Sequence, residues 1–63
     1  MKTFYGVVSK FFDNGKVTAE IIKHIGSTIP DSTYQEGITC DTYTDWFASL
    51  KKAEQYKKEA LNA

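Results

Sequence analysis

Large apolar side chains fall on both faces of a β-hairpin that the hydrophobic pattern predicts for residues 3–25. Side chains of a strand alternate between the two faces of its sheet, so a strand with one solvated face carries a polar residue at every second position. The first strand departs from this rule, because Phe4 and Val8 share one face while Tyr5 and Val7 share the other. The pattern therefore predicts a sheet that needs cover on both sides.

The sequence Asp13-Asn14-Gly15 predicts the turn of this hairpin, because asparagine and glycine tolerate the positive φ angles of tight turns. Two loop lengths fit. A two-residue Asn-Gly loop would set Lys10 in the middle of an otherwise apolar face. A three-residue loop with glycine in the bulge position would instead gather Tyr5, Val7, Ser9, Phe11, Val17, Ala19 and Ile21. We favour this loop, because it keeps charge out of that face and places the small Ser9 and Ala19 where a helix can approach closely.

Residues 26–33 predict a loop, since Pro30 lacks a backbone donor and lies among serine, threonine and aspartate. A third strand is predicted at about Tyr34–Thr44, where threonine and tyrosine are frequent and polarity alternates. We expect Ile38 and Cys40 to point from this strand into the core.

A helix is predicted from about Ser49 to Leu61, with Ser49 as its N-cap and strong helix formers throughout. Helical spacing gives it one apolar stripe, formed by Leu50, Ala53, Tyr56, Ala60 and Leu61. The helix should therefore lie on the sheet, and Trp46 and Phe47, just before it, should close the end of the core.

Together these elements predict a single α+β domain over residues 1–63, a three-stranded antiparallel β-meander with one C-terminal helix packed on one face (β-β-β-α). The predicted core consists of Tyr5, Val7, Phe11, Val17, Ala19, Ile21, Ile38, Cys40, Trp46, Leu50, Ala53, Tyr56 and Leu61. A domain of this size buries only roughly 60% of the surface that its unfolded chain exposes, so contact with a second copy or a larger partner would add needed stability.

The charge balance favours no polyanionic partner, because 8 basic residues, all of them lysine, match 8 acidic ones. Arginine, the side chain best suited to phosphate and guanine, does not occur. No apolar run predicts a signal peptide or a membrane span, so the expected location is the cytoplasm and no membrane partner is expected. The charges are unevenly placed, since residues 26–49 hold four acidic residues and no lysine, which could orient a dimer or a partner.

Catalysis is not predicted, and no cofactor or metal motif is present in the sequence. Cys40 is the only cysteine and its place in the alternating pattern points it inward. His24 is the only histidine and has no carboxylate near it in sequence to orient it. A triad of Ser9, His24 and Asp41 can be written down, but no nucleophile-elbow sequence accompanies it. We therefore expect a protein that binds and is not an enzyme.

The segments TFYGVVSKFFDNGKV and DTYTDWFASLKKAEQYKKEAL together cover more than half of the chain. They resemble a group of short uncharacterised proteins of bacterial phages and mobile elements, in which a Tyr-Gly strand, an Asp-Asn-Gly turn and an Asp-Trp-Phe step into a terminal helix recur. The resemblance implies a biological setting, and no activity comes with it.

The aromatic content, 14% of the chain, is the main functional signal, because one helix cannot cover so many rings. In the favoured register, the face away from the helix carries a predicted partner-binding patch of Phe4, Val8, Lys10, Phe12, Ile22 and Tyr43. This patch predicts a small non-enzymatic protein-interaction module. It would self-associate or dock on a larger protein, for example as a phage or mobile-element accessory or inhibitor protein.

The alternative is a single-stranded nucleic-acid binder. Bases would stack on Phe4, Phe12 and Tyr43, and phosphates would meet lysines of the hairpin, Lys10, Lys16 and Lys23. The zero net charge and the absence of arginine count against this alternative.

Overall fold

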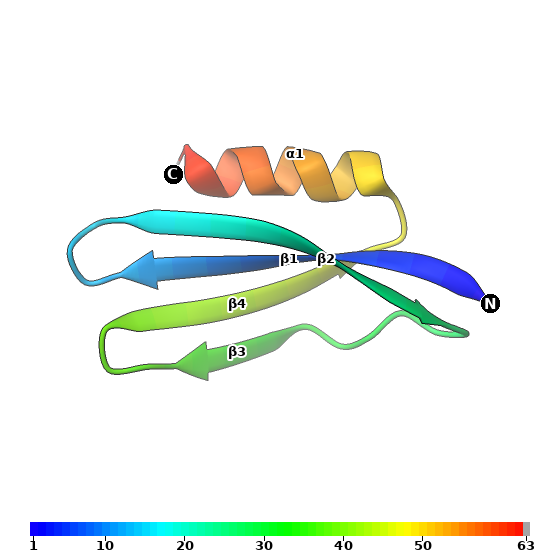
Figure 1. Cartoon of the computed structure of the whole chain (residues 1–63), viewed down its shortest axis with the longest axis horizontal. Coiled ribbons are helices and arrows are strands. Elements are labelled where there is room, and N and C mark those ends of the chain that lie inside the picture. The colour runs from blue at the N-terminus through cyan, green and yellow to red at the C-terminus, as the bar shows by residue number, and fades with distance from the viewer. Residues whose placement is uncertain (63) are drawn as a thin grey trace.

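The computed structural model describes residues 1–62, which form four β-strands and one α-helix (Figure 1). These elements are β1 (Lys2–Phe12), β2 (Val17–Gly26), β3 (Thr33–Glu36), β4 (Cys40–Phe47) and α1 (Leu50–Leu61). The strands make one antiparallel sheet in the order β2-β1-β4-β3, so β1 and β4 are central. The predicted α+β class, with an antiparallel sheet and a C-terminal helix, is confirmed.

The prediction of a three-stranded meander is wrong. The predicted third strand is broken into β3 and β4 by a tight turn, in which the Gly37 amide donates to the Cys40 carbonyl at 2.9 Å. A side chain at Gly37 would place its Cβ 2.5 Å from that same oxygen, so the turn requires glycine. Ile38 sits in the turn and is 98% exposed, outside the predicted core, because a turn residue has no sheet face to point from.

The connection between β2 and β3 also differs from a meander. β4 pairs with β1, so residues 27–32 must carry the chain from the β2 edge of the sheet to the opposite edge. Figure 1 shows this connector running past the ends of the central strands before β3 begins. The loop itself was predicted, but its role as a crossing between the two edges was not.

The three-residue loop of the first hairpin is confirmed. The Phe12 amide donates to the Lys16 carbonyl at 2.8 Å, and the Gly15 amide donates to the Phe12 carbonyl at 3.0 Å. Gly15 has a φ of 88°, the left-handed conformation that glycine adopts at no steric cost. In the resulting register, Val7 pairs with Ile21 and the predicted set of small and apolar residues shares one face.

Helix α1 packs on this face, mainly over β1 and β2, and runs along the β2 side of the sheet (Figure 1). Val7 and Ala53 are fully buried and Ser9 is 1% exposed, as expected if small side chains allow a close approach. Ser49 is the N-cap residue with an extended backbone, although its side chain makes no capping hydrogen bond. Leu50 and Leu61, predicted in the core, are 42% and 47% exposed, because they form the two ends of a helix that is fully buried only at Ala53.

The face of the sheet opposite α1, here called the second face, has a small apolar cluster of its own. Gly6 pairs with Trp46 of β4, and a Cβ at Gly6 would lie 2.9 Å from two carbons of the Trp46 ring. The ring therefore lies over the backbone of Gly6, and its edge meets the His24 ring at a centroid distance of 5.8 Å. Phe4, opposite His24 on the same face, is only 6% exposed. This local cover was not foreseen from the sequence.

Candidate functional site

The predicted partner-binding patch is divided by the structure. Phe4 is buried in the cluster of the second face, so the expectation that it is exposed is wrong. Tyr43 pairs with Ser9 and therefore lies on the α1 side, opposite the face predicted for it. The four remaining residues do share the second face, where Val8 and Phe12 are half-buried and Lys10 and Ile22 are exposed. Glu20, Thr42 and Thr44 pair among them, so no continuous apolar surface remains.

A groove on the α1 side is the more distinctive site. Because α1 lies mainly over β1 and β2, the β4 and β3 half of the same face is left beside the helix. There the structure forms a groove of about 310 Å³, lined by Phe11, Asp41, Tyr43 and Tyr56, which we call the aromatic groove. Its residues come from β1, β4 and α1, and they meet because Asp41 pairs with Phe11 in the sheet.

Two rings of the aromatic groove, Phe11 and Tyr43, contact each other, and Tyr34 extends this row of rings beyond the groove lining. The Phe11 and Tyr43 rings are nearly perpendicular, at 83°, with centroids 5.6 Å apart. Tyr34 of β3 lies opposite Tyr43, with centroids 4.7 Å apart and an interplanar angle of 37°. Tyr34 is 54% exposed and Tyr43 is 39% exposed, so much of this aromatic surface meets solvent. Such geometry stabilises aromatic pairs and also leaves ring surface for a ligand.

Tyr56 forms the opposite side of the groove and is fixed by two contacts with β4. Its hydroxyl donates to Asp45 Oδ2 at 2.8 Å, and its ring lies 5.2 Å from the Phe47 ring. The hydrogen bond to Asp45 raises the pKa of Tyr56 above its ordinary value of 10.0, and desolvation raises it further. The side chain is thus held as a neutral donor in a defined orientation.

Carboxylates lie at the rim of the aromatic groove. The Tyr34 hydroxyl donates to Asp41 Oδ1 at 3.3 Å, and Glu36 pairs with Asp41 across β3 and β4. Partial desolvation raises the pKa of Tyr34 above 10.0, and the negative charges of Asp41 and Glu36 raise it further. With Asp45 on the same face, and no lysine between residues 26 and 49, β3 and β4 contribute acidic side chains and no basic one to this half of the face.

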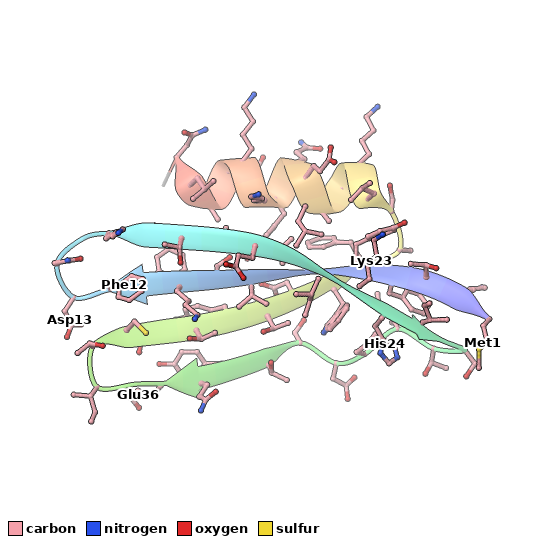
Figure 2. All side chains as sticks on the ribbon, viewed as in Figure 1. Met1, Phe12, Asp13, Lys23, His24 and Glu36 are labelled. Carbon is pink, nitrogen blue, oxygen red and sulfur yellow. The ribbon has the colours of Figure 1, made fainter. Side chains whose placement is uncertain are left out.

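The helix lysines lie on different sides of α1. Figure 2 shows long side chains that end in nitrogen extending from α1 on the side away from the sheet. Ala53 and Ala60 mark the middle of the helix face that meets the sheet, and at about 100° per residue Tyr56 and the half-buried Lys57 fall on opposite sides of it. Since Tyr56 reaches β4, Lys57 lies on the β2 side of the helix, whereas Lys52, four residues before Tyr56, lies on the β4 side.

Sequence reasoning assigned the residues of this groove to other roles. Phe11 and Tyr56 are expected in the core, Asp41 is considered as a member of a triad and as one of the acidic residues of the segment 26–49, and Tyr34 is only the start of a strand. One signal was available in Gly37, because a turn there places Tyr34 opposite Tyr43. The half-covered α1 face, in contrast, had no signal in the sequence.

The other candidate residues do not form a site. Ser9 lies on the α1 side while His24 lies on the second face, so the possible triad with Asp41 is not assembled. Cys40 is a half-buried free thiol at the start of β4. Within residues 1–62, no group of three His, Cys, Asp or Glu side chains is arranged to hold a metal ion.

The residues proposed for nucleic-acid binding are also separated. Figure 2 shows Phe12 at the turn end of the first hairpin, whereas Lys23 lies toward the other end of the sheet. Lys10 is on the second face, while Lys23 and Tyr43 are on the α1 side. The rings therefore do not alternate with the lysines along one surface that could follow a phosphate backbone.

Comparison of the chain with models of protein families, with curated proteins and with solved structures gives no match. The resemblance to short phage and mobile-element proteins therefore stays a prediction. In the part of the chain that the structure describes, no helix combines the length and the apolar character needed to cross a membrane.

Proposed function

We propose that this chain is a small protein-interaction module that holds a segment of another protein in the aromatic groove. The observation that carries the proposal is the exposure of Tyr34 and Tyr43, at 54% and 39%, beside a groove formed by three different elements. Aromatic residues are enriched in protein interfaces, where they bury a large area at a small cost in conformational entropy. The proposal moves the predicted contact surface from the second face to the α1 side.

The size of the groove supports a segment as the occupant. A volume of about 310 Å³ is near the lower limit for sites that enclose a small molecule, and it fits one or two side chains. The short edge strand β3 borders the groove, and all four of its residues are exposed. An extended segment could pair with the backbone of β3 while it places a side chain in the groove, as in other modes of peptide recognition at sheet edges.

A displayed library of random peptides, with this chain as bait, tests the proposal. We expect selected peptides to lose most of their binding to the double variant Tyr34→Ser, Tyr43→Ser, and to shift the amide resonances of groove residues in the wild type. Ile38→Ser is the matched control, because Ile38 is a fully exposed apolar residue outside the groove. Peptides that bind the double variant as tightly as the wild type, or no enrichment at all, would overturn the proposal.

A further inference from the structure

We propose that the side chain held in the aromatic groove is cationic, a lysine or an arginine from a basic segment of another protein. This inference rests on the proposed function and adds the chemical class of the ligand. The first support is the aromatic lining of the groove, because the face of an aromatic ring carries negative potential and attracts a cation within about 6 Å of its centroid. Phe11, Tyr43 and Tyr56 come from three elements and line the same groove, so a side chain that enters it meets aromatic rings.

The second support is the placement of the carboxylates. Asp41 is itself part of the groove lining, and its contact with Tyr34, at 3.3 Å, uses only one of the acceptor positions of a carboxylate. Glu36 lies opposite Asp41, and Asp45 follows on the same face of β4. A cation over the rings would therefore meet a hydrogen-bond acceptor and attractive negative charges, whereas an anion would be repelled by the same charges.

The third support is that the strands beside the groove contribute no lysine. The segment of residues 26–49, which includes β3 and β4, contains none, so no basic side chain of these strands neutralises Asp41 there. A long side chain suits the site, since its methylene groups can lie along the rings while its charged end reaches Asp41.

The experiment is a titration of the ¹⁵N-labelled protein with a short peptide, acetyl-Gly-Ala-Lys-Ala-Gly-amide, and two relatives with arginine or norleucine in the middle. Norleucine keeps the aliphatic chain of lysine and removes the charge. We expect the lysine and arginine peptides to shift amide resonances around the groove, with the norleucine peptide binding about fivefold more weakly. Affinity for the charged peptides should also fall as salt is added.

Asp41→Asn is the matching protein variant, because it keeps the shape of the side chain and removes its charge. It should weaken the lysine peptide about fivefold and leave the norleucine peptide unchanged. Asp31→Asn is the control, since Asp31 is an exposed acidic residue of the connector between β2 and β3. The comparison of lysine with norleucine on the wild type needs no variant and decides the question even if Asp41→Asn is poorly folded.

Three results would overturn the inference. The norleucine peptide could bind as tightly as the lysine peptide, the shifts could fall outside the groove, or the groove resonances could shift on concentrating the protein alone, which would identify a second copy as the occupant. Display peptides that depend on the groove but lack basic residues would overturn this inference and leave the proposed function standing. An absence of groove-dependent peptides would overturn both.

Discussion

Substitution of Gly6 by alanine tests the packing of the second face directly. A Cβ at this position would lie 2.9 Å from Cε3 and Cζ3 of Trp46 and 3.0 Å from Cη2, closer than the 3.4–4 Å of ordinary contact. The indole must therefore retreat from the sheet, which disturbs its contact with the His24 ring. The three nearest atoms all belong to the Trp46 ring, and Gly6 has no positive φ, so the added strain arises from this contact and not from the backbone.

The expected loss is about 1–2 kcal/mol in the free energy of unfolding. Forcing an extra methyl group into a packed site costs about 1–3 kcal/mol, and the lower entropy of the unfolded chain with alanine returns about 0.4–1 kcal/mol. A chain of this length has a total stability of roughly 3–9 kcal/mol, so the loss is a large part of it. Urea denaturation followed by far-ultraviolet circular dichroism measures the change.

Two comparisons isolate the cause. The three clashing atoms belong to the six-membered ring of the indole, and the shorter phenylalanine side chain does not reach their positions. In a Trp46→Phe background, Gly6→Ala should therefore change the free energy of unfolding by less than about 0.5 kcal/mol. Gly26→Ala separates the two contacts of the indole, because its Cβ would meet the end of the exposed His24 side chain, which can move, and would not enter the space between Trp46 and Gly6, so its loss should be smaller than that of Gly6→Ala. The reasoning is refuted if Gly6→Ala is as stable as the wild type, or if the loss persists in the Trp46→Phe background.

Three further variants test other parts of the structure. Ser9→Ala removes a buried hydroxyl that has no hydrogen-bond partner, so the chain should become about 1 kcal/mol more stable to urea, and a loss of stability would contradict this view. Tyr56→Phe should cost about 1 kcal/mol at neutral pH by deleting the hydrogen bond to Asp45. Since the folded-state pKa of Tyr56 is raised above 10.0, this stabilisation is present below pH 10 and is lost as pH rises through the folded-state pKa. In alkaline melting experiments, the melting temperature of the variant should therefore fall less with rising pH than that of the wild type. Ile38→Ser should change the melting temperature little, because Ile38 is 98% exposed, and a loss of 2 kcal/mol, roughly that of a core residue, would mean that it is buried.

The sequence predicts only part of the candidate site. The excess of aromatic residues and the run without lysine were visible, and both now meet in the aromatic groove. The position of the site could not be predicted, because the face of the sheet that Tyr43 occupies depends on whether β4 pairs with β1 or with β2. Side chains of a strand alternate between two faces whichever strand it pairs with, but the pairing decides which elements cover each face.

The sequence by itself determined the features that depend on neighbours along the chain. Asp13-Asn14-Gly15 placed the turn, because glycine alone adopts the φ of 88° without strain, and the apolar pattern of the two strands, which keeps Lys10 out of the face of Val7 and Ile21, selected the three-residue loop and the register of β1 and β2. The apolar stripe and the strong helix formers predicted α1 at Ser49–Leu61, one residue longer at its start than the observed Leu50–Leu61. These choices are local, and local steric and hydrogen-bonding preferences are sufficient to make them.

The tertiary structure alone decided which strands meet and what covers each face. Pairing β4 with β1 placed Trp46 over Gly6, on the second face, where Phe4 is also buried although the helix lies on the other side of the sheet. The same pairing left β3 and β4 beside α1 and created the groove. Gly6 and Trp46 are about 40 positions apart, and a contact over such a distance leaves no periodic pattern in the sequence. It forms because this pairing of strands, together with the path of the connector, gives the fold of lowest free energy.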